Sequence, residues 1–203
     1  HRKERKGRRS PLEQDEAVTI GRTVGASTLV WHRGDEVCFH AAGDASREDG
    51  RPFVRNTLIQ IFSMTKPVTG VALMQLWERG KFGLDDPLEW HLPEYAATQV
   101  LVGETQSGEA ITALPKRKIT IRDVLRHTAG FSYGPQGPAQ NASDRKWEEL
   151  DPLDPDNTLA EFSIKLAQVP LLHEPGTHWS YSAGVDVQGR LVEVLSGQPL
   201  ADY

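Results

Sequence analysis

The fold is decided by the stretch Thr57-Leu-Ile-Gln-Ile-Phe-Ser-Met-Thr-Lys-Pro-Val-Thr-Gly-Val-Ala-Leu-Met-Gln-Leu-Trp-Glu-Arg-Gly80. An extended apolar segment, 57–62, gives way here to a segment with helical periodicity, 68–78. The apolar residues of that segment recur at helical spacing and predict one buried stripe. The members of the stripe are Val68, Val71, Ala72, Met74 and Leu76. Gly80 is typical of a helix end.

At the junction, Ser63 and Lys66 stand three residues apart and would share one face of the helix, one turn apart. The positive end of the helix dipole favours developing negative charge on the Ser63 oxygen. Lys66 is then a candidate proton acceptor, as in other Ser-Lys nucleophiles. Its neutral form costs roughly 4–5 kcal/mol at pH 7, so burial or another cation would have to lower its pKa. The alternative is an N-cap serine followed by a surface lysine.

Three further blocks follow in order. They are Gly83-Leu-Asp-Asp-Pro-Leu-Glu-Trp-His-Leu-Pro-Glu94, Ile119-Thr-Ile-Arg-Asp-Val-Leu-Arg-His-Thr-Ala-Gly-Phe131 and Glu174-Pro-Gly-Thr-His-Trp-Ser-Tyr-Ser182. Together with Ser63-Met-Thr-Lys66, they resemble the serine β-lactamase-like hydrolases, which include class C β-lactamases, D-alanyl-D-alanine peptidases and related esterases. The resemblance covers residues 20 to 203. It implies an α+β fold of the β-lactamase/transpeptidase type, with strands of an antiparallel sheet and a mainly helical region.

The same resemblance makes Tyr181 the second catalytic candidate, because a tyrosine in a Y-x-N element relays the proton in that family. The asparagine position holds Ala183 here. Loss of that amide removes a contact worth about 1–3 kcal/mol to β-lactam or peptide substrates. We therefore expect carboxylic esters as substrates, with β-lactamase or D-Ala-D-Ala carboxypeptidase activity as the alternative. Taken alone, Tyr181 could also be a core tyrosine.

The resulting hypothesis is a serine hydrolase for small-molecule esters or amides. Ser63 attacks the carbonyl and forms an acyl-enzyme, Lys66 accepts its proton together with Tyr181, and Tyr181 protonates the leaving group. The Ser63 N–H would form half of the oxyanion hole, and neither metal nor organic cofactor is expected. The hypothesis from another class is a non-catalytic binding homologue or an inactive fragment.

The resemblance also implies sequence that this chain does not contain. The family continues beyond the position of Tyr203 with further strands and a third motif, K-T-G or H-x-G, which supplies the second oxyanion-hole N–H. Losing one such donor costs roughly 2.7–4 kcal/mol of transition-state stabilisation. We therefore expect a C-terminally truncated domain whose activity on its own is weak.

The composition is that of an ordinary soluble domain: 203 residues, net charge −5 and one cysteine, Cys38. This balance excludes a nucleic-acid binder, and no apolar run is long enough to span a membrane. The basic start predicts a disordered tail over residues 1–15, followed by the hydrolase domain over 16–203. No secretory signal is recognisable in the chain as given, which favours the cytoplasm. The natural substrate and oligomeric state stay open.

Local signals outline the remaining elements. We expect a hairpin of strands 26–31 and 36–41 around an Arg33-Gly-Asp35 turn, a polar loop over 44–52, and a short hairpin within 97–118. Capping boxes at Thr120 and Thr158 predict helices that end near residues 127 and 168. Residues 133–156 are expected to be loop. Ser182 is expected to cap a last helix that ends at Gly197.

Histidines and one asparagine complete the candidates. With Ser63-Met-Thr-Lys66 counted as the first block, the third block is 119–131. His127 lies in this third block and is expected to be structural. His173 and His178 flank a Pro-Gly turn without the spacing of a zinc site. Asn141 begins a formal glycosylation sequon, which we interpret as a chance match.

Overall fold

The computed structural model describes residues 9–203, so the first eight residues of the predicted tail lie outside it. The chain forms two compact units, His1–Ile61 and Phe62–Tyr203. The predicted domain, 16–203, spans the boundary between them.

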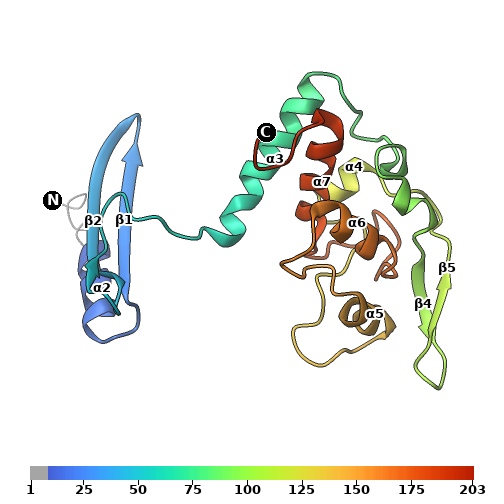
Figure 1. The fold of residues 1–203 in the computed structure, drawn as a ribbon, viewed down its shortest axis with the longest axis horizontal. Coiled ribbons are helices and arrows are strands. Elements are labelled where there is room, and N and C mark those ends of the chain that lie inside the picture. The colour runs from blue at the N-terminus through green and yellow to red at the C-terminus, as the bar shows by residue number, and fades with distance from the viewer. Residues whose placement is uncertain (1–8) are drawn as a thin grey trace. The chain divides into compact units, whose positions relative to one another are not determined.

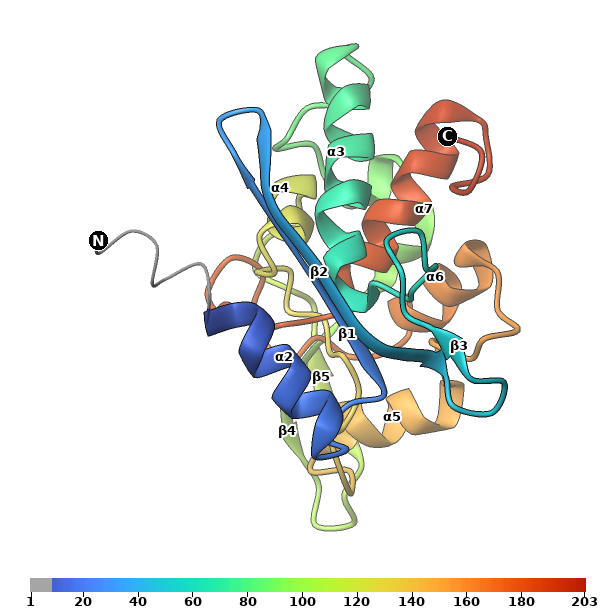
Figure 2. The ribbon, with the colours of Figure 1, turned by 90° about the vertical axis from the view of Figure 1, so that its left-hand side faces the viewer.

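The first unit is a helix and a small antiparallel sheet with strand order β1-β2-β3. Its elements are α2 Arg9–Thr19, β1 Gly25–His32, β2 Asp35–Ser46 and β3 Arg51–Pro52. Helix α2 packs against β1 and β2 (Figure 2). It begins inside the segment for which the sequence predicts a disordered tail.

The predicted hairpin is present, with Gly25 opposite Gly43 and His32 opposite Asp35. Its turn places Arg33 and Gly34 at φ +54° and +90°, and this left-handed pair suits a tight hairpin. The prediction of a loop over 44–52 is wrong at both ends, since β2 runs on to Ser46 and pairs with β3. Polar residues hide the pairing there, since the end of β2 is only half-buried and β3 is exposed.

The second unit is mainly helical. Its elements are η1 Phe62–Met64, α3 Thr65–Glu78, η2 Leu88–Trp90, η3 Pro93–Ala97, β4 Val100–Glu104, β5 Ala110–Ala113, α4 Ile121–Leu125, α5 Ala142–Leu150, α6 Leu159–Ala167 and α7 Gly184–Ser196. Helices α3 and α7 pack side by side (Figure 1). Strands β4 and β5 form the predicted short hairpin.

Two helix starts lie where the sequence predicted them, and two differ from the prediction. The boxes at Thr120 and Thr158 are both formed, through Asp123 and Glu161. The prediction of a continuous loop over 133–156 is wrong, because Asn141 caps α5 by accepting a hydrogen bond from the Asp144 N–H. Ser182 is not the N-cap of α7, since that position falls on Ala183 and carries no side-chain cap.

The core of this unit lies between α3, α4, α6 and α7. On α3 the buried residues are Thr69, Leu73 and Leu76. The predicted stripe is right at Leu76, which is buried, and at Ala72, which packs against the core. It is wrong at Val68 and Val71, which are 64% and 58% exposed. Helical spacing allows both stripes, and packing against α7 selects the one centred on Leu73.

Among the residues described, no helix is both long and apolar enough to cross a bilayer. The predicted location of the protein stays a prediction.

Candidate active site

Ser63 lies in the single 3₁₀ turn η1 that leads directly into α3. The residue before it, Phe62, has φ +46° and a side chain that is 76% exposed. A bulky residue rarely adopts this left-handed conformation, and such strain is concentrated at functional sites. The bend turns the chain from the extended segment into the helix and presents the Ser63 hydroxyl at the surface.

The three side chains predicted as catalytic converge. Lys66 Nζ donates a hydrogen bond to Ser63 Oγ over 3.2 Å, from the next turn of the chain. Tyr181 comes from the loop before α7, 118 residues away in sequence, and its Oη lies 3.1 Å from Ser63 Oγ. Lys66 Nζ is also 5.0 Å from the centre of the Tyr181 ring. A nucleophile, a cation and a phenol within hydrogen-bond reach can transfer a proton between them.

Electrostatics divide the roles of Lys66 and Tyr181. The side-chain interaction with Tyr181 raises the pKa of Lys66 above its ordinary value, against a smaller opposing effect of burial. Interactions with Lys66 first, and with Ser63, lower the pKa of Tyr181. The condition for a lysine base, a lowered pKa, is therefore not met. Lys66 is therefore cationic at pH 7, and its charge favours the ionised form of the Tyr181 hydroxyl.

Two rings hold Tyr181 in place. His127 stacks on it at 5.4 Å between centroids and 14° between planes. Tyr133 meets it edge-on at 5.1 Å and 75°. The His127 ring is itself fixed by a 3.1 Å hydrogen bond between its Nδ1 and Ser182 Oγ. His127 is thus in contact with the site, where the sequence predicted a structural residue; its place in the third block was the only signal.

Backbone hydrogen bonds tie the Tyr181 loop to the third block. The Ser180 N–H donates to the His127 carbonyl over 2.9 Å, and the Ala183 N–H donates to the Ser132 carbonyl over 3.2 Å. His127 has φ +57°, a left-handed conformation that turns its ring out of α4. These contacts fix the loop on both sides of Tyr181, so its hydroxyl is positioned by backbone as well as by rings.

The third block is anchored in turn by a buried carboxylate. Asp123 accepts hydrogen bonds from both terminal nitrogens of Arg117 and from the Thr128 hydroxyl. Burial acts to raise the pKa of Asp123, but Arg117 and Thr120 outweigh it and the net shift is downward. At Gly130, with φ +89°, a Cβ would collide with the His173 carbonyl oxygen at 2.2 Å. The turn therefore requires glycine.

Two cavities open beside the reactive hydroxyls. One, of about 320 Å³, is lined by Ser63, Lys66, Thr69, Leu159 and Asp186, among others. The other, of about 390 Å³, is lined by Tyr181, Ser180, Gln136 and Leu172, among others. Tyr133 lines both cavities, whereas Ser63 lines only the first and Tyr181 only the second. Both volumes suit small organic ligands.

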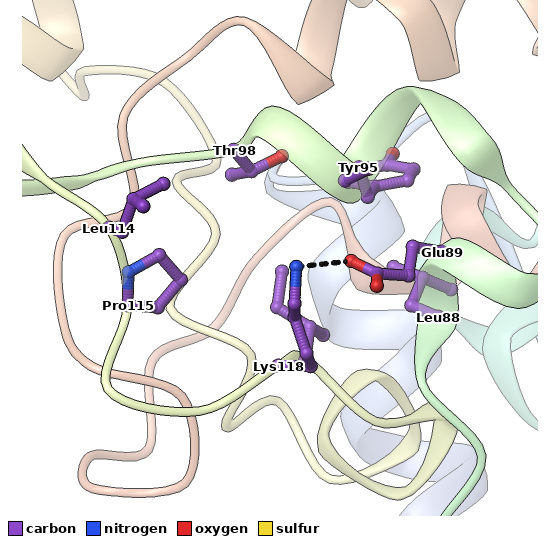
Figure 3. Close-up of a pocket in the computed structure, with 9 residues that line it drawn as sticks. Leu88, Glu89, Tyr95, Thr98, Leu114, Pro115 and Lys118 are labelled. Atoms are coloured by element: carbon purple, nitrogen blue, oxygen red, sulfur yellow. Dashed lines mark ion pairs between the residues drawn. The ribbon is translucent and has the colours of Figure 1, made fainter.

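A third, smaller cavity of about 100 Å³ contains none of these residues (Figure 3). Lys118 and Glu89 form a 2.8 Å ion pair across it, next to Leu88 and Tyr95. Its charged groups are already paired, so it offers no nucleophile or base.

Other predicted candidates do not form a metal site. His173 and His178 stack at 4.5 Å. Within the described residues no group of three or more His, Cys, Asp or Glu side chains could hold a metal ion.

Comparison with known proteins identifies the family to which this fold belongs. The family model named Beta-lactamase matches residues 13–203, so the chain belongs to the beta-lactamase family. It is 35% identical to Esterase EstB of Burkholderia gladioli over 92% of the chain and 45% of that protein. It is 31% identical to the Lovastatin esterase of Penicillium rubens over 92% of the chain and 46% of that protein.

A solved structure, EstCE1, described as a hydrolase with promiscuous acyltransferase activity, superposes with TM-score 0.77 at 34% identity. The match covers 93% of this chain and 46% of EstCE1. Unliganded simvastatin synthase (LovD) from Aspergillus terreus also gives TM-score 0.77, at 28% identity, over 95% of this chain and 49% of LovD. The expected β-lactamase/transpeptidase-like fold is confirmed. The chain spans about half the length of the relatives it matches.

Proposed function

We propose that this protein is a serine hydrolase that acts on carboxylic esters through an acyl-enzyme at Ser63. The observation that carries the proposal is the position of Ser63 Oγ, 3.1 Å from Tyr181 Oη and 3.2 Å from Lys66 Nζ. Esterases among the relatives and Ala183 in place of the family's asparagine favour esters over β-lactams. The proposal includes activity of this chain by itself, although the chain spans only about half the length of its relatives.

The proposed cycle begins with proton transfer from Ser63 to the Tyr181 oxygen. Ser63 Oγ then bonds to the ester carbonyl carbon, and the Ser63 N–H stabilises the oxyanion. When the carbon–oxygen bond to the alcohol breaks, Tyr181 returns the proton to the leaving alkoxide. A water then gives its proton to Tyr181 and attacks the acyl carbon. The bond from this carbon to Ser63 Oγ breaks, Tyr181 returns the proton to Oγ, and the acid is released. Lys66 stays cationic throughout and holds Tyr181 in its reactive protonation state.

A second candidate is acyl transfer to an alcohol, which takes the place of water in the last step. It is favoured by relatives named as acyltransferases, such as the Monascus pilosus protein, 32% identical over 92% of this chain. Turnover of a p-nitrophenyl ester with added alcohol distinguishes the two, because transfer yields a new ester and hydrolysis yields only acid.

The test of Ser63 is intact mass after incubation with a fluorophosphonate probe. We expect one adduct on the wild-type chain and none on Ser63→Ala, with circular dichroism showing that both are folded. A folded wild-type chain without an adduct would instead support a binding homologue or inactive fragment. Faster turnover of nitrocefin than of short p-nitrophenyl esters would contradict the ester preference.

A further inference from the structure

The cavity on the Ser63 side contains a carboxylate that the proposed chemistry does not use. Asp186 lies in the first turn of α7, is half-buried, and lines this cavity together with Ser63 and Lys66. Tyr181 does not line it. Because the acyl group stays bonded to Ser63 after the alcohol has left, this cavity is the one open to the acyl group.

The Asp186 carboxylate has no side-chain partner in the part of the chain that the structure describes. Its hydrogen bond comes from its own backbone N–H, and Lys66 acts on it only through charge. It does not cap α7, whose N-cap Ala183 has no side-chain hydrogen bond. Burial raises the pKa of this carboxyl. A half-buried carboxylate with no donor beyond its own backbone N–H is incompletely satisfied, and a ligand that donates a hydrogen bond would stabilise it.

The other walls of the cavity determine which donor fits. Lys66 already places a positive charge there, so a second cation would be repelled by Lys66 while it is attracted by Asp186. An anion would in the same way be attracted by Lys66 and repelled by Asp186. A neutral donor can bind the carboxylate without being repelled by either charge. Phe62, Leu159 and Leu200 give the cavity apolar walls, against which a hydrocarbon chain can pack.

We propose that Asp186 is a specificity-determining residue that selects acyl groups carrying a neutral hydrogen-bond donor, a hydroxyl or an amide N–H. This inference rests on the proposed function, since it assigns the cavity to the acyl half of the ester. The preferred substrates are hydroxyacyl or acylamino esters, and the simple alkanoyl esters of equal size are poorer.

The test compares two pairs of p-nitrophenyl esters in which a methyl group replaces the hydroxyl: 3-hydroxybutanoate with 3-methylbutanoate, and 6-hydroxyhexanoate with heptanoate. The rate of the p-nitrophenolate burst measures acylation of Ser63. The variants are Asp186→Ala and Asp186→Asn, with the exposed Asp202→Ala as the matched control. Fluorophosphonate labelling of each variant reports separately whether Ser63 is still reactive.

We expect the wild-type chain and Asp202→Ala to prefer at least one hydroxylated ester about tenfold over its partner, the size of one charge-assisted hydrogen bond. Asp186→Ala should lose that preference, whatever its absolute rate of fluorophosphonate labelling, and Asp186→Asn should keep part of it. Equal preference in the wild type and Asp186→Ala would overturn the inference.

A wild-type chain that is not labelled at all would contradict the proposed function instead. Binding of 6-hydroxyhexanamide and heptanamide, measured by ligand-observed NMR, then tests whether the cavity selects a hydrogen-bond donor, and it needs no reaction. If the wild-type chain binds the hydroxylated amide preferentially and Asp186→Ala loses this preference, the result supports Asp186 as the residue that accepts the hydrogen bond from the hydroxyl. Equal binding of both amides contradicts it.

Discussion

At the scale of single residues, the proposed chemistry depends on how the charge of Lys66 acts on the Tyr181 hydroxyl. Lys66 and Ser63 lower the pKa of Tyr181. Ionised Tyr181 is the proposed base, so the labelling rate should rise with pH to a plateau, with its midpoint below the ordinary tyrosine value of about 10. The same interaction raises the pKa of Lys66, which therefore stays charged across that range. The measurement is the rate of fluorophosphonate labelling between about pH 6 and 10, which covers the pH range below the ordinary tyrosine pKa.

The matched variants for this profile are Lys66→Met and Lys66→Arg. Removal of the charge in the methionine variant should move the midpoint upward and lower the rate at pH 7 by roughly tenfold or more, since each pKa unit changes the ionised fraction tenfold. The arginine variant keeps the charge and should retain a midpoint below 10. A methionine variant with the wild-type profile would show that Tyr181 does not act as the base.

The ring of His127 stacks on Tyr181 and holds this side chain in position. Burial first, and the charge of Lys66 second, lower the pKa of His127, so the stacked ring is neutral at pH 7. Asparagine tolerates the left-handed backbone at this position but has no ring. We expect His127→Asn to remain folded and to be labelled up to roughly tenfold more slowly, the size of a strong aromatic pair.

The companion variant, His127→Phe, restores a ring at the cost of strain at φ +57°. It should be labelled faster than His127→Asn despite a lower midpoint of thermal unfolding. A purely structural His127 would show the opposite order, with labelling that follows stability.

At the scale of elements, the sequence predicted those whose signals are local. Capping boxes at Thr120 and Thr158 located two helix starts, and the turn at Arg33 located the hairpin. Elements that depend on tertiary contacts were predicted wrongly or missed. The phase of α3 is set by its packing against α7, and the contact between His127 and Tyr181 joins segments 54 residues apart, a separation that no local pattern encodes. The spacing of Ser63 and Lys66 at a helix start made both of them candidates, whereas Tyr181 was recognisable only through the resemblance to the family.

The phase of α3 gives a stability prediction. Leu73 is fully buried, whereas Val71, on the predicted stripe, is 58% exposed. Leu73→Ala should lower the free energy of unfolding by about 2–5 kcal/mol because it leaves a cavity. Val71→Ala should change it by no more than about 0.5 kcal/mol. Urea denaturation of both variants measures the difference, and equal losses would mean that the stripe lies where the sequence placed it.

At the scale of the whole molecule, the two units differ in how much apolar surface each buries. The buried hydrophobic residues all lie between Leu73 and Val192, within the second unit. From residue 13 to 61, the part of the first unit whose side chains are described, no residue reaches full burial. Regions with few buried apolar contacts open at low free energy.

We therefore expect hydrogen exchange to separate the units. Amides of β1 and β2 should exchange faster than those of α3 and α7, although both sets are hydrogen-bonded. Mass spectrometry of peptic fragments after deuterium labelling measures both sets in one sample. Leu73→Ala should accelerate exchange in α3 and α7 more than in β1 and β2. Uniform protection across the chain, lost everywhere at once in that variant, would instead show that the two units unfold as one cooperative body.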